Sequence, residues 1–151
     1  MYSTPDAQVT LQEITEETLG PILRLEVADN QKHFVATNAV SIAQAHFSQN
    51  AWFRAIYADD TPVGFVMLYI DEEKPEYMVW RFMIDKNQQG KGYGYQALLK
   101  VIEHVRSLPK AKDLFLSYVP KEGNASPFYR QLGFEETGEM DQGENIMKLM
   151  L

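Results

Sequence analysis

Seven short stretches of this chain have the pattern of β-strands: residues 9–14 alternate between apolar and polar positions, and several of the others are apolar runs rich in aromatic and β-branched residues. Alternation with a period of two is typical of half-buried β-strands. The pattern therefore predicts strands at residues 9–14, 52–58, 63–70, 77–84, 113–119, 134–139 and 145–151.

Between these strands, apolar residues recur three or four positions apart, which predicts amphipathic helices. Thr15 is placed to cap the first helix, and Pro21 marks either its first turn or a kink. Ser41 is expected to cap a second helix. A long helix opens from the loop at 85–92 and runs to about residue 107, and a short one spans 125–132. The apolar positions are Leu19, Ile22, Leu23 and Val27 in the first helix and Ala97, Leu98, Val101, Ile102 and Val105 in the long one.

The elements follow one another as strand, two helices, three strands, helix, strand, helix and two strands. Residues 59–62 read Asp-Asp-Thr-Pro, a turn sequence that should join the strands on either side into a hairpin. A strand–helix–strand crossover follows, and such a connection joins parallel strands. We therefore expect an α/β fold of the mixed α+β kind, with a mostly antiparallel sheet and helices on its faces, as a single domain over residues 1–151.

Composition excludes several kinds of chemistry. The chain has no cysteine, which rules out disulfides, thiolate metal sites and a cysteine nucleophile. Its three histidines, His33, His46 and His104, show no ligand spacing, so we expect no metal. No apolar run reaches the length of a signal peptide or a membrane span, which favours a cytoplasmic protein.

The charge balance is acidic, with 14 lysines and arginines against 21 acids and a formal net charge of −7. A negative field disfavours nucleic-acid backbones and anionic membranes as partners. It favours cationic small molecules such as amines, although an acidic surface also simply keeps a protein in solution.

A glycine-rich loop lies between the strand at 77–84 and the long helix, and Gly90, Gly92 and Gly94 alternate along it. Glycine allows close backbone approach, and the first amides of a helix favour an anion, so the loop suits a phosphate group. A P-loop would need Ser or Thr after Lys91, where Gly92 stands. A dinucleotide fingerprint should follow the first strand directly, whereas at least three strands precede this loop.

The segment Gln89-Gly90-Lys91-Gly92-Tyr93-Gly94 resembles the signature of the GNAT superfamily of N-acetyltransferases, and Tyr129 stands four residues before Gly133-Phe134 as that family's second landmark does. The order of elements fits along nearly the whole chain. The resemblance implies a GNAT-type mixed, mostly antiparallel sheet of about six to seven strands flanked by about four helices. Residues 31–45, 80–94 and 138–151 look most like bacterial spermine/spermidine acetyltransferases, so the resemblance implies transfer of the acetyl group of acetyl-CoA to a small polyamine.

The resemblance also assigns roles to individual residues. It implies that the pantetheine arm of acetyl-CoA pairs with the strand before the loop, that the loop amides bind the pyrophosphate, and that Tyr129 is the general acid. A phenol with a pKa of ~10 can protonate a thiolate whose acid has a pKa of ~8.5 to 10 without an uphill step. The cofactor-binding residues so implied are Phe82, Met83, Ile84, Gln89, Gly90, Lys91, Gly92, Tyr93, Gly94 and Tyr95.

Several assignments stay open at this stage. Glu26, Glu76 and Glu122 are candidates for the general base, but a carboxylate in such a position is more often simply a surface group, so none is assigned the role. Many family members carry Asn seven residues before the tyrosine, but here that position is Glu122 and the nearest asparagine is Asn124. Aromatic residues on strands could wall an amine pocket or simply fill the core; these are Trp52, Tyr69, Tyr77 and Trp80.

The resemblance allows a homodimer, and it leaves two alternative functions. The chain could be a non-catalytic acyl-CoA-binding sensor, or an acetyltransferase that acts on a protein amine.

Overall fold

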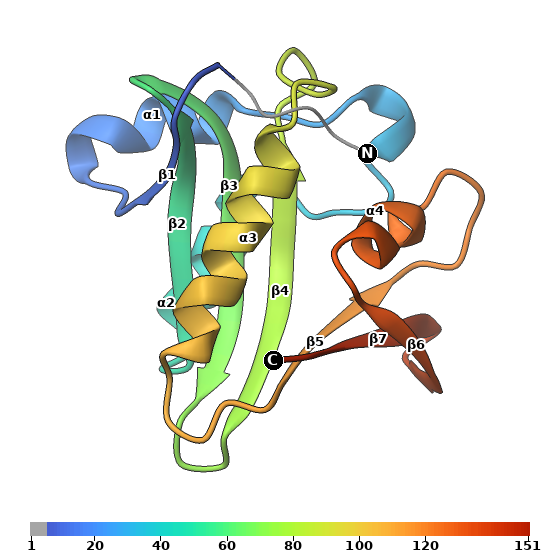
Figure 1. The fold of residues 1–151 in the computed structure, drawn as a ribbon. Coiled ribbons are helices and arrows are strands. Elements are labelled where there is room, and N and C mark those ends of the chain that lie inside the picture. The colour runs from blue at the N-terminus through green and yellow to red at the C-terminus, as the bar shows by residue number, and fades with distance from the viewer. Residues whose placement is uncertain (1–5) are drawn as a thin grey trace.

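A computed structural model describes residues 6–151, which form one seven-stranded sheet with helices on both faces (Figure 1). The elements in chain order are β1 (Val9–Gln12), α1 (Glu16–Arg24), the 3-10 helix η1 (Asp29–Gln31), α2 (Asn38–His46), β2 (Ala51–Ala58), β3 (Thr61–Asp71), β4 (Glu76–Ile84), α3 (Tyr93–Arg106), β5 (Asp113–Tyr118), α4 (Ser126–Gln131), β6 (Glu135–Asp141) and β7 (Glu144–Met150). The predicted strands and helices are all present.

The strand order is β1-β2-β3-β4-β5-β7-β6, and every neighbouring pair is antiparallel except β4 and β5. Those two parallel strands pair only at Met78 with Phe115 and at Val79 with Leu116. Beyond this point β5 runs away from β4, as Figure 1 shows. The expected mixed, mostly antiparallel sheet is therefore confirmed. Its parallel strands, β4 and β5, diverge beyond their two paired positions.

A β-bulge accompanies this opening. Met67 and Leu68 of β3 are paired with Arg81 and Val79 of β4, which leaves Trp80 without a partner across the ladder. A bulge of this kind bends a strand and re-aims its side chains. It therefore helps β4 to turn away from β5.

Two apolar cores hold the helices against the sheet. On one face, the predicted stripe of α3 is buried, and Leu98, Val101 and Val105 are inaccessible to solvent. On the other face, Ile22 of α1 and Ala45 of α2 pack with Phe65 and Met67 of β3. Full burial of one such aliphatic side chain contributes roughly 1.5–3 kcal/mol, so these contacts fix α3 and the loop before it on the sheet.

The boundaries differ from the predicted ones near the N-terminus. Thr37, not Ser41, caps α2, because the Thr37 hydroxyl accepts from the Val40 amide at 3.3 Å. Ser41 lies inside the helix, and its buried hydroxyl donates to the Thr37 carbonyl at 3.1 Å. The first helix ends at Arg24 because Leu25 is extended, so Val27 lies outside it, and β1 ends two residues early at Gln12. Pro21 lies within α1.

Within residues 6–151, no helix is both long enough and apolar enough to cross a membrane.

Candidate active site

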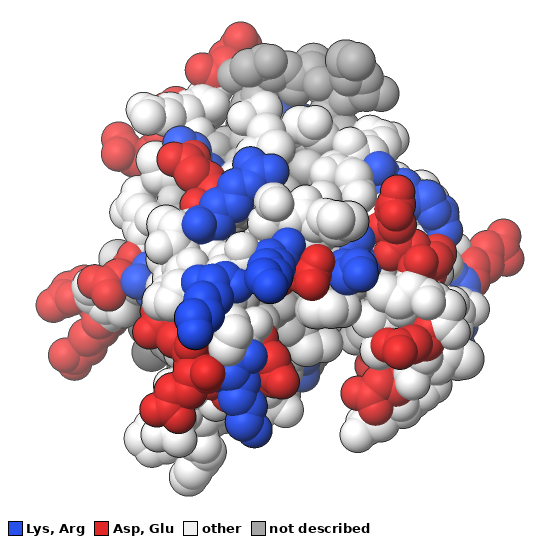
Figure 2. Space-filling model, turned by 60° about the horizontal axis from the view of Figure 1, so that its bottom comes forward, with Lys and Arg blue, Asp and Glu red and all other residues white. Residues whose placement is uncertain are grey.

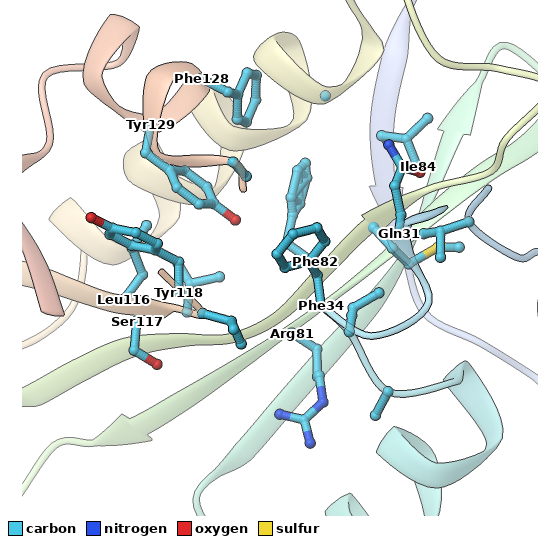
Figure 3. Close-up of a pocket in the computed structure, with 18 of the residues that line it drawn as sticks. Gln31, Phe34, Arg81, Phe82, Ile84, Leu116, Ser117, Tyr118, Phe128 and Tyr129 are labelled. Atoms are coloured by element: carbon cyan, nitrogen blue, oxygen red, sulfur yellow. The ribbon is translucent and has the colours of Figure 1, made fainter. Parts of the chain in front are cut away.

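A cavity of about 1090 Å³ opens where β4 and β5 diverge (Figure 3). The glycine loop and the first turn of α3 form one end of it. The open edge of β4 faces the last residues of β5 across the middle, and the segment around η1 covers it from the other side. Residues from seven separate parts of the chain thus meet at the point where the sheet splits.

The glycine loop shapes the end of the cavity next to α3. Gly92 has a φ of 85° and is the N-cap of α3, so no side chain caps this helix. Gly94 allows α3 to lie close to the sheet, since a Cβ there would sit 3.4 Å from Ile84 and 3.5 Å from the Phe82 ring. The two glycines therefore bring the uncapped N-terminus of a 14-residue helix to the cavity, an arrangement that attracts anions.

Side-chain amides fix the loop in this position. The Gln89 Nε2 donates to the Ile84 carbonyl at 2.9 Å and to the Gln31 Oε1 at 2.9 Å, and Gln31 donates back to Gln89 at 3.2 Å. Lys91 lies on the outer side, where its ammonium donates to the Gln88 Oε1 at 3.1 Å. Unlike its neighbours, Lys91 is not among the residues that line the cavity.

The strand before the loop offers an open edge. Phe82, Met83 and Ile84 all contribute to the cavity wall, and past Val79 they have no ladder partner on β5. The Met83 side chain itself is buried on the opposite face of the sheet, where its sulfur contacts the Asn38 amide at 3.8 Å. The backbone of this segment is thus the part of β4 that an extended, amide-bearing ligand can pair with.

Tyr129 comes from α4 and points its hydroxyl into the cavity (Figure 3). Its half-buried ring packs on Phe128 and Phe134 at centroid distances of 5.5 and 5.9 Å. Loss of water around the phenol raises the pKa of Tyr129 to about 12. Within residues 6–151 the hydroxyl makes no hydrogen bond, so it is free to donate to a ligand.

Polar contacts hold α4 against the last hairpin. The Tyr118 hydroxyl donates to the Glu136 carboxylate at 2.7 Å, and Arg130 of α4 contacts the same oxygen at 2.8 Å. Asn145 of β7 donates to the Tyr118 hydroxyl at 3.3 Å. This network spans β5, β6, β7 and α4, and it sets where the helix that carries Tyr129 lies.

The wall of the cavity near β5 and β7 carries one carboxylate. Glu144 is half-buried there and accepts a hydrogen bond from the Ser117 hydroxyl at 3.1 Å. Arg81 of β4 lines the same region, with its guanidinium bonded to the Trp80 carbonyl at 3.1 Å and to Gln44 of α2 at 3.0 Å. Burial lowers the pKa of Arg81, and the negative charge of Glu144 opposes that change.

All three residues considered as the general base lie outside the cavity that contains Tyr129. Glu26 pairs with Lys86 and Lys32 on the surface, and Glu122 is exposed in the loop before α4. Glu76 lines a second cavity, which adjoins the first because Tyr69 and Met78 contribute to both. None of these three carboxylates lines the cavity that contains Tyr129.

The other residues singled out in the sequence divide into two groups. Asn124 shapes its own loop, accepting from the Ser126 amide and donating to the Lys121 carbonyl at 2.8 Å each, and it does not line the cavity. Tyr69 and Trp80 do line it, whereas Tyr77 belongs to the neighbouring cavity and Trp52 stacks on His104 at 4.4 Å. Within residues 6–151, no cluster of three or more His, Cys, Asp or Glu residues could hold a metal ion.

Sequence reasoning missed Gln31, Arg81, Ser117 and Glu144. Each is a single polar residue in or beside a predicted element, with no motif around it. Only Glu144 had a local signal, because it follows the predicted Gly143 turn.

Comparison with known proteins identifies the family. The model of the acetyltransferase (GNAT) family matches residues 13–134. A probable spermine N(1)-acetyltransferase of Bacillus subtilis subsp. natto is 32% identical over 146 residues, which cover 92% of this chain and 96% of that protein. A spermine/spermidine N(1)-acetyltransferase of Bacillus subtilis strain 168 is 31% identical with the same coverage.

Solved structures share the fold. An acetyltransferase from Thermus thermophilus has a TM-score of 0.78 at 14% identity, covering 98% of this chain and all of that one. The PaiA N-acetyltransferase from Thermoplasma acidophilum, solved with coenzyme A, has a TM-score of 0.72 at 15% identity over 95% of this chain and 99% of that one.

The split sheet and the glycine N-cap of α3 suit a ligand that carries both amide and phosphate groups, and the comparisons place the protein among the acyltransferases. More specifically, the chain belongs to the GNAT acetyltransferase family. It is an acetyl-CoA-dependent N-acetyltransferase, as the sequence analysis predicted.

Proposed function

We propose that the protein transfers the acetyl group of acetyl-CoA to a primary amine of a small polyamine such as spermidine or spermine, and that residues 1–151 act as one N-acetyltransferase domain. The observation that carries the proposal is the single cavity in which the glycine loop, the open β4 edge and the Tyr129 hydroxyl meet. The spermine and spermidine named for the Bacillus relatives support the choice of acceptor.

The residues present fit acetyl-CoA. The pyrophosphate would take the amides of the loop and of the first turn of α3, where Gly92 leaves the helix uncapped. The pantetheine arm would pair with the backbone of β4 past its bulge. Beyond its backbone amide, Lys91 would supply only a long-range positive charge, since its side chain points away from the cavity to Gln88. The residues proposed to bind the cofactor are Phe82, Met83, Ile84, Gln89, Gly90, Lys91, Gly92, Tyr93, Gly94 and Tyr95.

In the proposed mechanism the neutral amine attacks the thioester carbonyl carbon directly in a ternary complex. Backbone amides of β4 near the Trp80 bulge stabilise the oxygen as it gains charge. When the carbon–sulfur bond breaks, Tyr129 protonates the leaving thiolate and recovers a proton from the amide nitrogen. No covalent enzyme intermediate is required.

The raised pKa makes Tyr129 a weaker acid than a phenol in water. A phenol with a pKa of about 12 would lose free energy in giving its proton to a water-exposed thiolate, whose acid has a pKa of ~8.5. The thiolate forms in the same cavity, however, and the desolvation that raises the phenol pKa raises the thiol pKa as well. Tyr129 therefore acts by stabilising the thiolate where water cannot.

The acceptor is expected to be a small molecule rather than nucleic acid or a membrane. On the face shown in Figure 2, lysine and arginine side chains lie among aspartate and glutamate side chains instead of forming one continuous basic surface. Homodimer formation and a cytoplasmic location stay predictions.

A screen of amine acceptors with acetyl-CoA, followed by release of free thiol, tests the proposal. We expect spermine and spermidine to accelerate thiol release well above a mixed library of peptides with free amines. Equal or faster release with peptides would make the acceptor a protein amine. Coenzyme A binding without any amine-dependent release would instead make the protein a sensor of acyl-CoA.

A further inference from the structure

The last hairpin brings one acidic side chain to the cavity. Between β6 and β7 the chain reverses through Gln142 and Gly143, which have φ values of 50° and 80°. Consecutive residues with positive φ form the tight hairpin turn that suits the twist of antiparallel strands. Asp141 and Glu144 close the turn as a cross-strand pair. Only Glu144 of this pair lines the cavity, whereas Asp141 is exposed.

The Glu144 carboxylate is held on one side only. Its Oε1 accepts from the Ser117 hydroxyl at 3.1 Å, which fixes the side chain between β5 and β7. Within residues 6–151 its second oxygen has no hydrogen bond and no cation within 4.0 Å. Glu144 is also the only carboxylate among the described residues that line this cavity.

Other charged groups near Glu144 leave this oxygen available. The negative charge of Glu144 acts on Arg81 of β4, but the terminal nitrogens of Arg81 bond to the Trp80 carbonyl and to Gln44. Glu136 on β6, in the same hairpin, is already bonded by Tyr118 and Arg130. A half-buried carboxylate that faces an open cavity without a paired cation is a site for a positively charged ligand group.

We propose that Glu144 receives the ammonium group of the acceptor and removes its proton before attack. This inference rests on the proposed function. The R–NH3+ group gives one proton to the carboxylate, which releases it to solvent, and the nitrogen lone pair then forms the new bond to carbon. The bond from carbon to sulfur breaks with its electron pair on sulfur, and the second proton reaches sulfur through Tyr129. Atoms and charges balance as amide, thiol and one released proton.

Chemistry requires such a group because the acceptor is protonated at neutral pH. A primary ammonium has a pKa of ~10.4, so only about one molecule in 2,500 is neutral at pH 7. A carboxylate positioned at the point of attack accepts this proton directly, and general-base catalysis of this kind is usually worth about 10²- to 10⁴-fold in rate.

The test compares Glu144→Gln with Asp141→Asn. Both changes remove one negative charge from the same turn, but Asp141 does not line the cavity. With spermidine, we expect Glu144→Gln to lower kcat/KM about 100-fold or more and Asp141→Asn to leave it within about twofold of wild type. Coenzyme A affinity should be unchanged in both variants, which also reports that they fold.

A second acceptor separates proton removal from a merely structural role. An amine with electron-withdrawing substituents is already neutral at the assay pH and needs no base, so the loss caused by Glu144→Gln should shrink to less than about tenfold.

Three outcomes would overturn the inference. If wild-type protein turns over spermidine and Glu144→Gln does so equally well, Glu144 has no part in the reaction. An equal loss with charged and neutral amines would assign it a structural role. If wild-type protein releases no thiol with any amine, the proposed function fails and this inference fails with it.

Discussion

Tyr129 shows how the surroundings of one residue set its chemistry. Its phenol sits among Phe128 and Phe134, and the missing water holds its pKa at about 12 instead of 10.0. At any physiological pH the side chain is therefore a proton donor and never a base. Its hydroxyl makes no hydrogen bond within the described chain, so it can donate to a bound substrate.

Replacing Tyr129 with Phe removes only the hydroxyl. We expect kcat to fall about 100-fold, because the leaving thiolate loses its donor, while coenzyme A affinity stays within about twofold. Steady-state kinetics and calorimetry measure the two effects. An unchanged kcat would remove Tyr129 from the mechanism, and a large loss of coenzyme A affinity would make its role one of binding.

The same pKa shift predicts how stability depends on pH. Above about pH 10 the unfolded chain loses the Tyr129 proton, whereas the folded protein keeps it until about pH 12. The folded state then binds more protons, so the free energy of unfolding falls as pH rises through this window. Urea unfolding at about pH 9 and about pH 11 should show a larger decrease for wild type than for Tyr129→Phe, and equal decreases would contradict the assignment.

Individual site residues were predictable from sequence only where a motif surrounds them. The loop from Gln89 to Gly94 and Tyr129 have fixed spacings to glycines, so a single sequence indicates them. Arg81, Ser117 and Glu144 reach the cavity from three different strands. Their proximity depends on sheet register and on the bulge at Trp80, which alternation of residues does not encode.

At the scale of elements, the loop before α3 is clamped to the segment after α1. Asp85 is buried, and its two oxygens accept from the Glu26 amide at 2.9 Å and the Asn87 amide at 3.1 Å. The Lys86 amide donates to the Glu26 carbonyl at 2.8 Å. One carboxylate therefore ties the wall near η1 to the glycine loop.

Asp85→Asn tests this clamp while keeping its shape. An amide side chain presents one oxygen and one NH2 group, so it can accept only one of the two backbone amides and leaves the other unsatisfied. We expect the free energy of unfolding to fall by about 1–3 kcal/mol, with weaker coenzyme A binding. Urea unfolding and calorimetry provide the measurement.

Lys86→Gln is the matched control, because it removes only the exposed ion pair with Glu26. Its stability should stay close to that of wild type. If Asp85→Asn is as stable as this control, the clamp does not hold the loop.

The predicted element boundaries were correct where apolar periodicity is long. They were wrong where two residues could each serve as the N-cap. The stripe of α3 gave that helix correctly because five buried positions repeat on one face. Around α2, both Thr37 and Ser41 are suitable caps by residue type, and burial of Ser41 decides between them. Burial is a tertiary property, so local sequence did not resolve the choice.

At the scale of the whole molecule, the sheet has a paired half and an open half. β1, β2 and β3 are joined by long antiparallel ladders with one register shift at Ile56 and Tyr57, whereas β4 and β5 share only two paired positions. The fold class followed from the order of elements. The place where the sheet opens did not, because it depends on pairing between strands that are far apart in the sequence.

Hydrogen exchange should report this division. Coenzyme A is expected to slow exchange in residues 80–84 and 88–95 by about tenfold or more, because amides without ladder partners gain acceptors there. Amides of β2 and β3 already bond within the sheet and should change by less than about twofold. Mass spectrometry of peptides from these regions measures both, and protection spread evenly over the sheet would contradict the proposed cofactor path.

The placement of the two indole rings has a further consequence. Trp80 lines the cavity, while Trp52 lies on the opposite side of the sheet between Arg54 and His104, at 4.3 and 4.4 Å. Ligand binding should therefore change the fluorescence emission of Trp80 and leave that of Trp52 unchanged. Trp80 fluorescence can therefore report coenzyme A binding, with Trp52 as an internal reference, so binding can be measured without an attached label.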